Sequence, residues 1–141
     1  MAARRLDAHC LCGDVKLSAE VDDLRVSVCH CDTCRRWCGG PFMALEGARE
    51  VSIAGTDRLG IYASSPTGER GFCIGCGTTL FFRTKDAAHY AVSAMACSDV
   101  DDAEMVDQIF IDSKPHWYEF ANDTKKLTGL EFFALHASDE E

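Results

Sequence analysis

The sequence predicts an all-β domain built of several short antiparallel sheets with little helix, stabilised by zinc. Three observations lead to this fold class. Apolar residues alternate with polar ones along most of the chain, glycine- and proline-containing turn signals separate the alternating segments, and seven of the nine cysteines form three tight clusters. A period of two is the pattern of strands that bury one face. A chain of 141 residues has the size of one domain. We therefore expect a single domain over residues 1–141, ordered from about 6 to 135.

Nine segments carry the strand pattern. We expect strands at residues 15–21, 26–28, 42–45, 51–53, 59–62, 79–82, 90–92, 109–111 and 130–133. Two short helical turns complete the prediction. One runs from Asp32 to Trp37 with Asp32 or Thr33 as its N-cap, and the other covers 98–106, where a serine is followed by acidic residues. The acidic C-terminal tail, 138–141, is expected to be disordered.

The composition excludes several classes of protein. Hydrophobic residues make up 47% of the chain, too many for a disordered protein. No stretch approaches the roughly 20 apolar residues of a membrane span. The formal net charge of −9 disfavours a nucleic-acid partner, because phosphate binding requires clustered Lys and Arg. The N-terminal segment lacks the apolar run of a secretory signal, so we expect a cytoplasmic protein with neither a membrane nor a nucleic-acid partner.

Two cysteine pairs have the spacing of zinc-binding knuckles. They are Cys10 with Cys12 and Cys73 with Cys76, and a glycine follows each pair directly. In a reducing compartment such close spacing, with an odd total of cysteines, favours metal ligands over disulfides. Four thiolates complete the tetrahedral coordination that structural zinc requires. We therefore expect the two pairs to share one zinc that stabilises the fold; two unrelated pairs of buried cysteines would not explain the spacings.

The remaining cluster contains three cysteines, Cys29, Cys31 and Cys34. Residues two apart on a strand point the same way, and a following turn can bring the third sulfur alongside. Three thiolates leave one zinc position for a ligand, which suits an incoming thiol because coordination favours its deprotonated form. Two alternatives remain open: Cys38 or Cys97 closes the site with a fourth sulfur, or no metal is retained there.

Several side chains near the third cluster are candidates for binding a substrate. Arg35, Arg36 and Trp37 could line a pocket for an anionic thiol, since Arg suits carboxylates and Trp packs on peptide groups. The simpler interpretation is a solvated arginine and a core tryptophan. We expect His30 to bond backbone or a carboxylate rather than metal, and Trp117 to be a core residue.

The motifs together resemble one known family. The segments 9–13, 29–37 and 72–80 and the later pair His116–Trp117 follow one another as in the glutathione-dependent formaldehyde-activating enzyme and centromere protein V family. The resemblance runs from about residue 6 to 120. It implies a β-tent fold and an activity that joins glutathione to formaldehyde, giving S-hydroxymethylglutathione. It also implies two zinc sites, a closed one on Cys10, Cys12, Cys73 and Cys76 and a second one on Cys29, Cys31 and Cys34.

The leading hypothesis is a zinc-dependent enzyme of the carbon–sulfur lyase type. It would bind a small thiol such as glutathione at the zinc held by Cys29, Cys31 and Cys34, which we take as the catalytic residues, and add that thiol to formaldehyde or another small electrophile. Two Zn²⁺ per chain are expected, one structural and one catalytic. The alternative is a non-catalytic zinc β-module that binds another protein, with both zincs structural.

Overall fold

The computed structural model describes residues 3–137, and within them the chain is mostly β with two short α-helices. This confirms the predicted fold class. The strands are β1 (Arg4–His9), β2 (Lys16–Val21), β3 (Arg25–Cys29), β4 (Phe42–Ala54), β5 (Leu59–Ala63), β6 (Gly68–Cys73), β7 (Thr79–Thr84), β8 (Tyr90–Ser93), β9 (Cys97–Ser98), β10 (Glu104–Ile109) and β11 (Lys125–Lys126). The helices are α1 (Asp32–Cys38) and α2 (Gly129–Ala137), and three 3-10 turns, η1 (Thr56–Arg58), η2 (Ala94–Ala96) and η3 (Ile111–Ser113), lie between strands.

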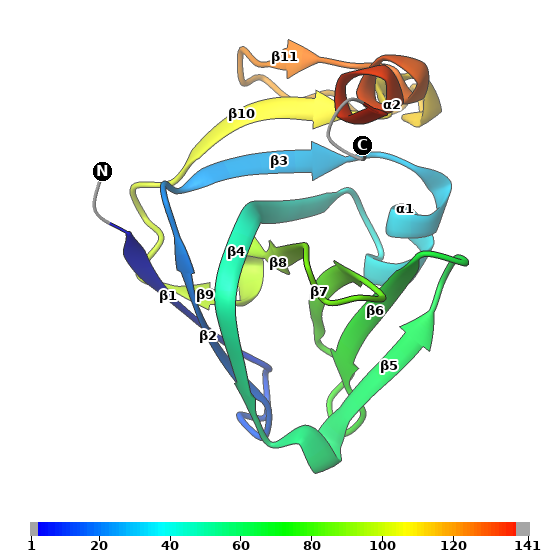
Figure 1. The fold of residues 1–141 in the computed structure, drawn as a ribbon. Coiled ribbons are helices and arrows are strands. Elements are labelled where there is room, and N and C mark those ends of the chain that lie inside the picture. Colours follow the sequence, from blue (N-terminus) through cyan, green and yellow to red (C-terminus); the bar gives the residue numbers. More distant parts are fainter. Residues whose placement is uncertain (1–2, 138–141) are drawn as a thin grey trace.

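The long strand β4 organises the sheet. Its first half pairs with β3 and β8, and its second half pairs with β2. Figure 1 shows the bend between the two halves. The register with β8 shifts between Glu46 and Ala48, an irregularity that bends a strand and increases its twist. The two strands predicted at 42–45 and 51–53 are therefore one strand of 13 residues, because the bulge turns the chain without ending its pairing.

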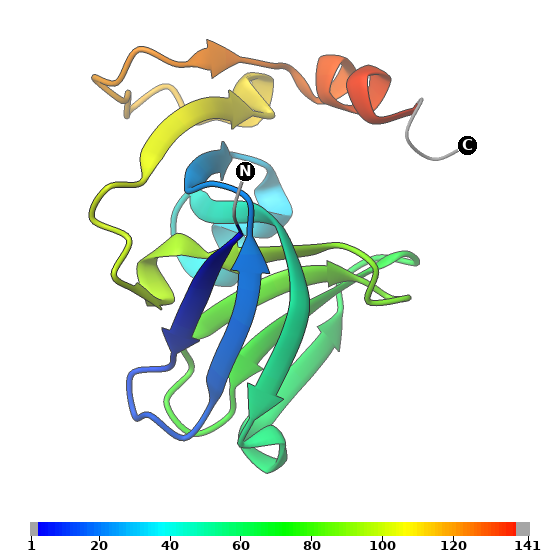
Figure 2. The same ribbon diagram turned by 60° about the vertical axis from the view of Figure 1, so that its left-hand side comes forward.

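The strands follow the order β11-β10-β3-β4-β8-β7-β6-β5. Off this path, β2 pairs with the second half of β4, β1 pairs with β2, and β9 pairs with β1. Most neighbours are antiparallel, but β10 is parallel to both β3 and β11. In Figure 1 these groups form the walls of a tent-like arrangement. In Figure 2 β10, β11 and α2 make up an outer layer beyond β3.

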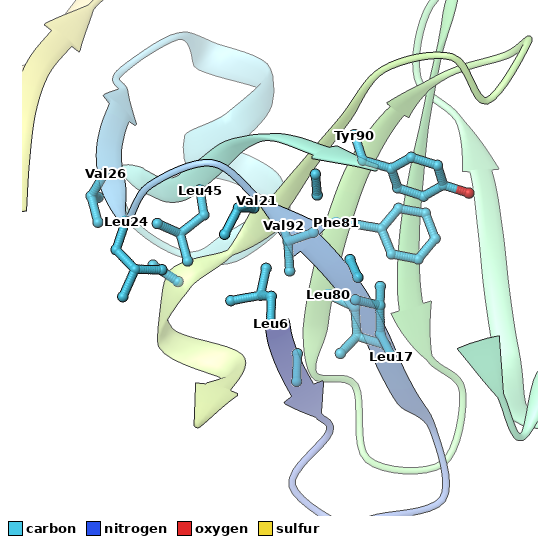
Figure 3. Close-up of a cluster of buried hydrophobic side chains, with 14 of the residues drawn as sticks. Leu6, Leu17, Val21, Leu24, Val26, Leu45, Leu80, Phe81, Tyr90 and Val92 are labelled. Carbon is cyan, nitrogen blue, oxygen red and sulfur yellow. The ribbon is translucent and has the colours of Figure 1, made fainter. Parts of the chain in front are cut away.

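The main core fills the space between the walls (Figure 3). Leu6, Leu45, Leu80 and Phe81, from the three strands β1, β4 and β7, are each at most 1% exposed. Burying such a side chain stabilises the fold by about 1.5–3 kcal/mol. A second, smaller apolar cluster consists of four buried residues with Trp37, Phe82 and three cysteines packed around it. The four are Cys34, Phe42, Ala44 and Ala91.

Two predicted elements are wrong in type. The segment 98–106, predicted as a helix, contains instead the end of β9 and the start of β10, because β10 pairs along β3 and this long-range pairing outweighs a local helical signal. The segment 130–133, predicted as a strand, lies in α2. A short apolar run fits either element. Here the Thr128 hydroxyl accepts from the Glu131 N–H at 3.1 Å, while the Glu131 carboxylate accepts from the Thr128 N–H at 2.8 Å, a capping box that begins a helix.

Smaller differences concern strand ends and missed strands. The strand predicted at 109–111 ends at Ile109, and the chain continues into η3. β1 and β6 were not predicted, the first because it is short and charged and the second because glycines interrupt it. None of the helices within residues 3–137 has the length and apolar character needed to cross a membrane. The tail predicted to be disordered, 138–141, lies outside the described residues.

Candidate metal centres

The structure brings the two cysteine pairs together as one four-sulfur cluster. The sulfur atoms of Cys10, Cys12, Cys73 and Cys76 all lie within 4.8 Å of one another. The Sγ–Sγ distance is 3.6 Å between Cys10 and Cys12 and 3.7 Å between Cys12 and Cys73. Tetrahedral zinc with Zn–S bonds of about 2.3 Å holds its sulfurs about 3.8 Å apart. The donor set and its spacing therefore fit a zinc ion.

The two halves of this cluster are tight turns that each end in a glycine. Gly13 and Gly77 have φ of +82° and +80°, a left-handed conformation that glycine adopts without strain. The N–H of Gly13 donates to the Cys10 carbonyl and that of Gly77 to the Cys73 carbonyl, at 3.1 and 2.8 Å. Each turn folds the backbone around its own pair of sulfurs, as the knuckle spacing predicts.

Neutral donors surround the four sulfurs. The backbone N–H of Val15 donates to Cys10 Sγ and that of Gly75 to Cys73 Sγ, both at 3.3 Å. Such hydrogen bonds offset the negative charge of buried thiolates. Because Cys10 and Cys73 are fully buried against the main core, the cluster is part of the packing that holds the fold.

Thr78, which was not among the predicted site residues, links the two halves of the cluster. Its hydroxyl oxygen accepts from the Leu11 N–H at 2.9 Å, and its hydroxyl hydrogen is then free for Cys76 Sγ, 3.2 Å away. The Thr78 hydroxyl is the main cause that lowers the pKa of Cys76, to about 5. A hydroxyl residue two positions after a knuckle cysteine was the signal that could have identified it.

The second cluster contains the sulfurs of Cys29, Cys31 and Cys34, all within 4.8 Å of one another. Cys29 ends β3, Cys31 precedes α1 and Cys34 lies in its first turn. The cap of α1 is Cys31, whose sulfur accepts from the Cys34 N–H at 3.4 Å, and not Asp32 or Thr33 as predicted. Hydrogen bonds among the three cysteines lower the pKa of Cys31 and raise that of Cys29.

No fourth ligand from Cys, His, Asp or Glu joins these three sulfurs within residues 3–137. The Cys38 thiol donates to the carbonyls of Cys34 and Gly40, at 3.0 and 2.9 Å. The Cys97 thiol donates to the Ser93 carbonyl at 3.3 Å and packs against the main core, as a small hydrophobe would. Burial raises the pKa of both thiols, that of Cys97 to about 12. Both sulfurs are therefore used as thiol donors to backbone in this structure.

His30 lies between two of these cysteines, and its side chain is fully buried. Its Nε2 is 2.8 Å from the Gln108 side-chain oxygen, which only accepts, so Nε2 carries the proton. Its Nδ1 then accepts from the Tyr118 hydroxyl at 2.7 Å. Burial lowers the pKa of this imidazole. The ring is not part of the sulfur cluster, but the predicted partners, backbone or a carboxylate, were wrong, since both partners are distant polar side chains.

A buried arginine contacts the three-sulfur cluster from the other side. Arg70, on β6, is 6% exposed, and its Nη1 donates to Cys34 Sγ at 3.2 Å. Its Nε donates to the Ser64 hydroxyl at 3.1 Å. The guanidinium carbon lies 5.0 Å from the ring centres of both Trp37 and Phe82, within the range of cation–π attraction. No local sequence pattern indicates this role, because Arg70 and Cys34 are 36 positions apart in the chain.

The other candidate substrate residues differ in their surroundings. Arg35 donates through Nε to the His30 carbonyl at 2.9 Å, whereas Arg36 is exposed and pairs with Asp32. Trp37 packs in the second apolar cluster. Trp117 was expected in the core, but it is 74% exposed, because the segment after η3 runs along the surface.

A surface groove of about 640 Å³ lies beside both clusters. Cys10 and Thr78 line one part of it, and Cys38, Phe42 and Cys97 line another. Neither the three-sulfur cluster itself nor the arginines of α1 line this groove. The predicted pocket of Arg35, Arg36 and Trp37 is therefore not part of this groove.

Comparison with known proteins gave three findings. The sequence pattern of the family described as glutathione-dependent formaldehyde-activating enzyme matches residues 5–113. A protein of Schizosaccharomyces pombe, named an uncharacterized lyase, is 39% identical over 123 residues, which cover 86% of this chain and 90% of the relative. The crystal structure of a Rhodobacter sphaeroides protein is similar with a TM-score of 0.55 and 21% identity, over 70% of this chain and 96% of that one, which shows likeness of fold alone.

Proposed function

The chain belongs to the glutathione-dependent formaldehyde-activating enzyme family, and we propose that it is a zinc-dependent lyase-type enzyme that adds a small thiol to formaldehyde or another small electrophile. Glutathione is the first candidate for the thiol, and the cytoplasm, where such thiols are abundant, is the proposed location. The observation that carries the proposal is the three-sulfur cluster with no fourth ligand among the described residues. The lyase name of the relative is consistent with it.

The proposed reaction needs neither an oxidant nor a reductant. The sulfur of the thiol forms a bond to the carbonyl carbon, the π bond of the carbonyl opens, and the proton of the thiol ends on the oxygen. The product is a hemithioacetal, and the same step in reverse releases both reactants. Catalysis of this kind depends on raising the thiolate fraction and on holding the two reactants together.

Cys29, Cys31 and Cys34 would hold the zinc, which when bound would supply the positive charge that favours the thiolate form of an incoming thiol. Cys29 and Cys31 are only partly buried, so a small ligand can approach the cluster from their side. The imidazole of His30, fixed by Tyr118, holds the backbone between these two cysteines in place.

Arg35 is the candidate for gripping the substrate. Its side chain is 28% exposed, and its Nε is already held by the His30 carbonyl, which places the guanidinium beside the cluster. A guanidinium with free donors can bind the carboxylate of a peptide-like thiol through two parallel hydrogen bonds. Asp32 lies 3.8 Å from its Nη2, a loose ion pair that such a carboxylate could replace.

Exchange NMR on glutathione and ¹³C-labelled formaldehyde tests the proposal. The adduct forms spontaneously, so the measured quantity is the acceleration over the uncatalysed rate with the zinc-loaded protein. We expect faster exchange with the wild type and none with Cys31→Ser. Cys97→Ser, outside both sulfur clusters, is the matched control and should retain the acceleration. Absence of acceleration in a wild-type protein that holds both metals would rule out this thiol and electrophile.

The alternative, a module that binds another protein, has one observation in its favour. Leu130, Phe133 and Leu135 on α2 are 84%, 61% and 53% exposed, more apolar surface than a short helix usually shows to water. This surface lies in the outer layer of the fold, whereas the three-sulfur cluster sits at the junction of β3 and α1. If the exchange assay fails while the second metal has four protein sulfurs, this alternative replaces the enzyme.

A further inference from the structure

Arg70 is a buried cation without a carboxylate partner. No Asp or Glu within residues 3–137 forms an ion pair with it, although its side chain is almost completely removed from water. Burying an unpaired charge is costly, so a charge in this position requires a neighbouring anion. The group that meets its Nη1 is the sulfur of Cys34, at 3.2 Å. The arginine therefore has a sulfur where other buried arginines have a carboxylate.

The surroundings of Arg70 fix its direction. The Ser64 hydroxyl holds Nε, and the rings of Trp37 and Phe82 each lie 5.0 Å from the guanidinium carbon. Phe82 is the cross-strand partner of Arg70 on β7, and Trp37 lies one helical turn after Cys34 on α1. An arginine held in this way cannot turn to the solvent without breaking all of these contacts, so its charge stays at the sulfur.

The two clusters differ in this respect. Around the four sulfurs the donors are neutral, namely backbone N–H groups and the Thr78 hydroxyl. An arginine does lie near that cluster, but Arg58 is 45% exposed, pairs with Asp14 and donates to no sulfur. A buried cation that donates to a cysteine sulfur is thus found only at the three-sulfur cluster within the described residues.

We infer that Arg70 is a positioning residue of the three-cysteine metal site, which balances the negative charge of the site and holds the Cys34 sulfur in its ligating position. Three thiolates around a divalent zinc carry one net negative charge, and the guanidinium makes the assembly neutral. A neutral site retains its metal with less electrostatic cost in a partly buried position and repels an anionic ligand less. The inference concerns metal retention, so it stands or falls independently of the substrate proposed above.

Cobalt(II) and a competing chelator test the inference on the full-length protein, without any substrate. The second metal equivalent is defined as the one that the Cys31→Ser variant lacks. Replacing a residue that supports a metal ligand typically weakens metal binding by about 10–100-fold. We expect this loss for the second equivalent in Arg70→Met. We also expect its sulfur-to-cobalt charge-transfer band to move to longer wavelength, because the Cys34 sulfur loses a hydrogen bond. The first equivalent should be unchanged.

Arg83→Met is the matched control. Arg83 is a partly buried arginine on the neighbouring strand and also packs on aromatic rings, but it pairs with Glu69 and touches no cysteine. It should leave both metal equivalents unchanged. Equal loss of the second metal in Arg83→Met would overturn the inference, as would wild-type affinity and an unshifted band in Arg70→Met.

Two further variants separate charge from fold. Arg70→Lys keeps the positive charge and Arg70→Gln keeps a donor without it, so the second metal should bind more tightly in the lysine variant. The reverse order would contradict charge compensation. If Arg70→Met also lost the first equivalent and failed to fold, the comparison of Lys with Gln would decide the question.

Discussion

The two sulfur clusters use the same ligand type in different surroundings. Cys10 and Cys73 of the four-sulfur cluster are fully buried against the main core, and neutral N–H and hydroxyl groups donate to its sulfurs. The three-sulfur cluster lies against the smaller apolar cluster, is partly exposed at Cys29 and Cys31, and receives a hydrogen bond from a buried arginine. In the four-sulfur cluster, however, Cys12 is exposed, so exposure does not separate the two clusters. The number of sulfurs and the charge of the donors change together, and these two properties separate a stabilising site from one that can take a ligand.

We expect the three-sulfur cluster to depend on the four-sulfur cluster more than the reverse. Strand β6 carries Cys73 to the four-sulfur cluster and Arg70 to the three-sulfur cluster. Cys29, Cys31 and Cys34 come from one continuous stretch at the end of β3 and the start of α1. Loss of the four-sulfur cluster should release β6 and with it the support of the other cluster. Loss of the three-sulfur cluster leaves β6 paired between β5 and β7.

The largest expected effect is the contrast between Cys73→Ser and Cys31→Ser. Structural zinc contributes on the order of 10 kcal/mol of apparent free energy to folding. Cys73→Ser should therefore unfold the domain and lose both metals. Cys31→Ser should keep the β-sheet circular dichroism and one tightly held zinc. Metal analysis together with thermal unfolding measures both quantities, and equal destabilisation by the two substitutions would contradict separate roles for the clusters.

Chelator treatment of the wild type should remove the two zinc ions at different times. The three-sulfur cluster has fewer protein ligands, so its zinc should leave first, with little change in circular dichroism. The zinc of the four-sulfur cluster should leave more slowly and together with the β-sheet signal. Zinc release is followed with a colorimetric chelator while circular dichroism is recorded. Simultaneous release of both metals with unfolding would show that the clusters are not energetically distinct.

Thr78→Val should weaken the four-sulfur cluster without removing a ligand. The substitution deletes the donor to Cys76 and the acceptor of the Leu11 N–H, and losing hydrogen bonds of this kind costs about 1–3 kcal/mol. Urea unfolding of the zinc-loaded protein should show this loss, with two metals still bound. Thr79→Val, at the neighbouring position, is the control and should change stability much less. No difference between the two variants would mean that the Thr78 hydroxyl does not support the cluster.

The sequence predicted which cysteines come together, because metal ligands must be close in space and the knuckle spacings report local geometry directly. What surrounds the sulfurs could not be predicted in this way. His30 meets Gln108 and Tyr118, which are 78 and 88 residues away in the chain, and Arg70 meets Cys34 across 36 residues. Such pairs depend on sheet order and register, which no local pattern contains.

The errors in secondary structure have the same origin, with one exception. β10 replaced a predicted helix because it pairs with β3, a long-range interaction. The register shift that bends β4 likewise depends on its pairing with β8. The start of α2, in contrast, was readable, because Thr128 and Glu131 have the spacing of a capping box and the apolar run after them fits a helix as well as a strand.

The smallest expected effect tests the difference in sulfur number between the clusters. Because the Cys38 thiol donates to backbone carbonyls and does not join the three sulfurs, Cys38→Ala should cost about 1 kcal/mol or less and leave both metals bound. X-ray absorption at the zinc edge should give an average of 3.5 sulfurs per metal, the mean of four and three, in the wild type and in the variant. A value of four that falls in Cys38→Ala would mean that Cys38 closes the site when zinc is present. The two clusters would then differ only in burial and charge. The number of sulfurs would no longer support a free ligand position at the three-sulfur cluster, and only the exchange assay could support it.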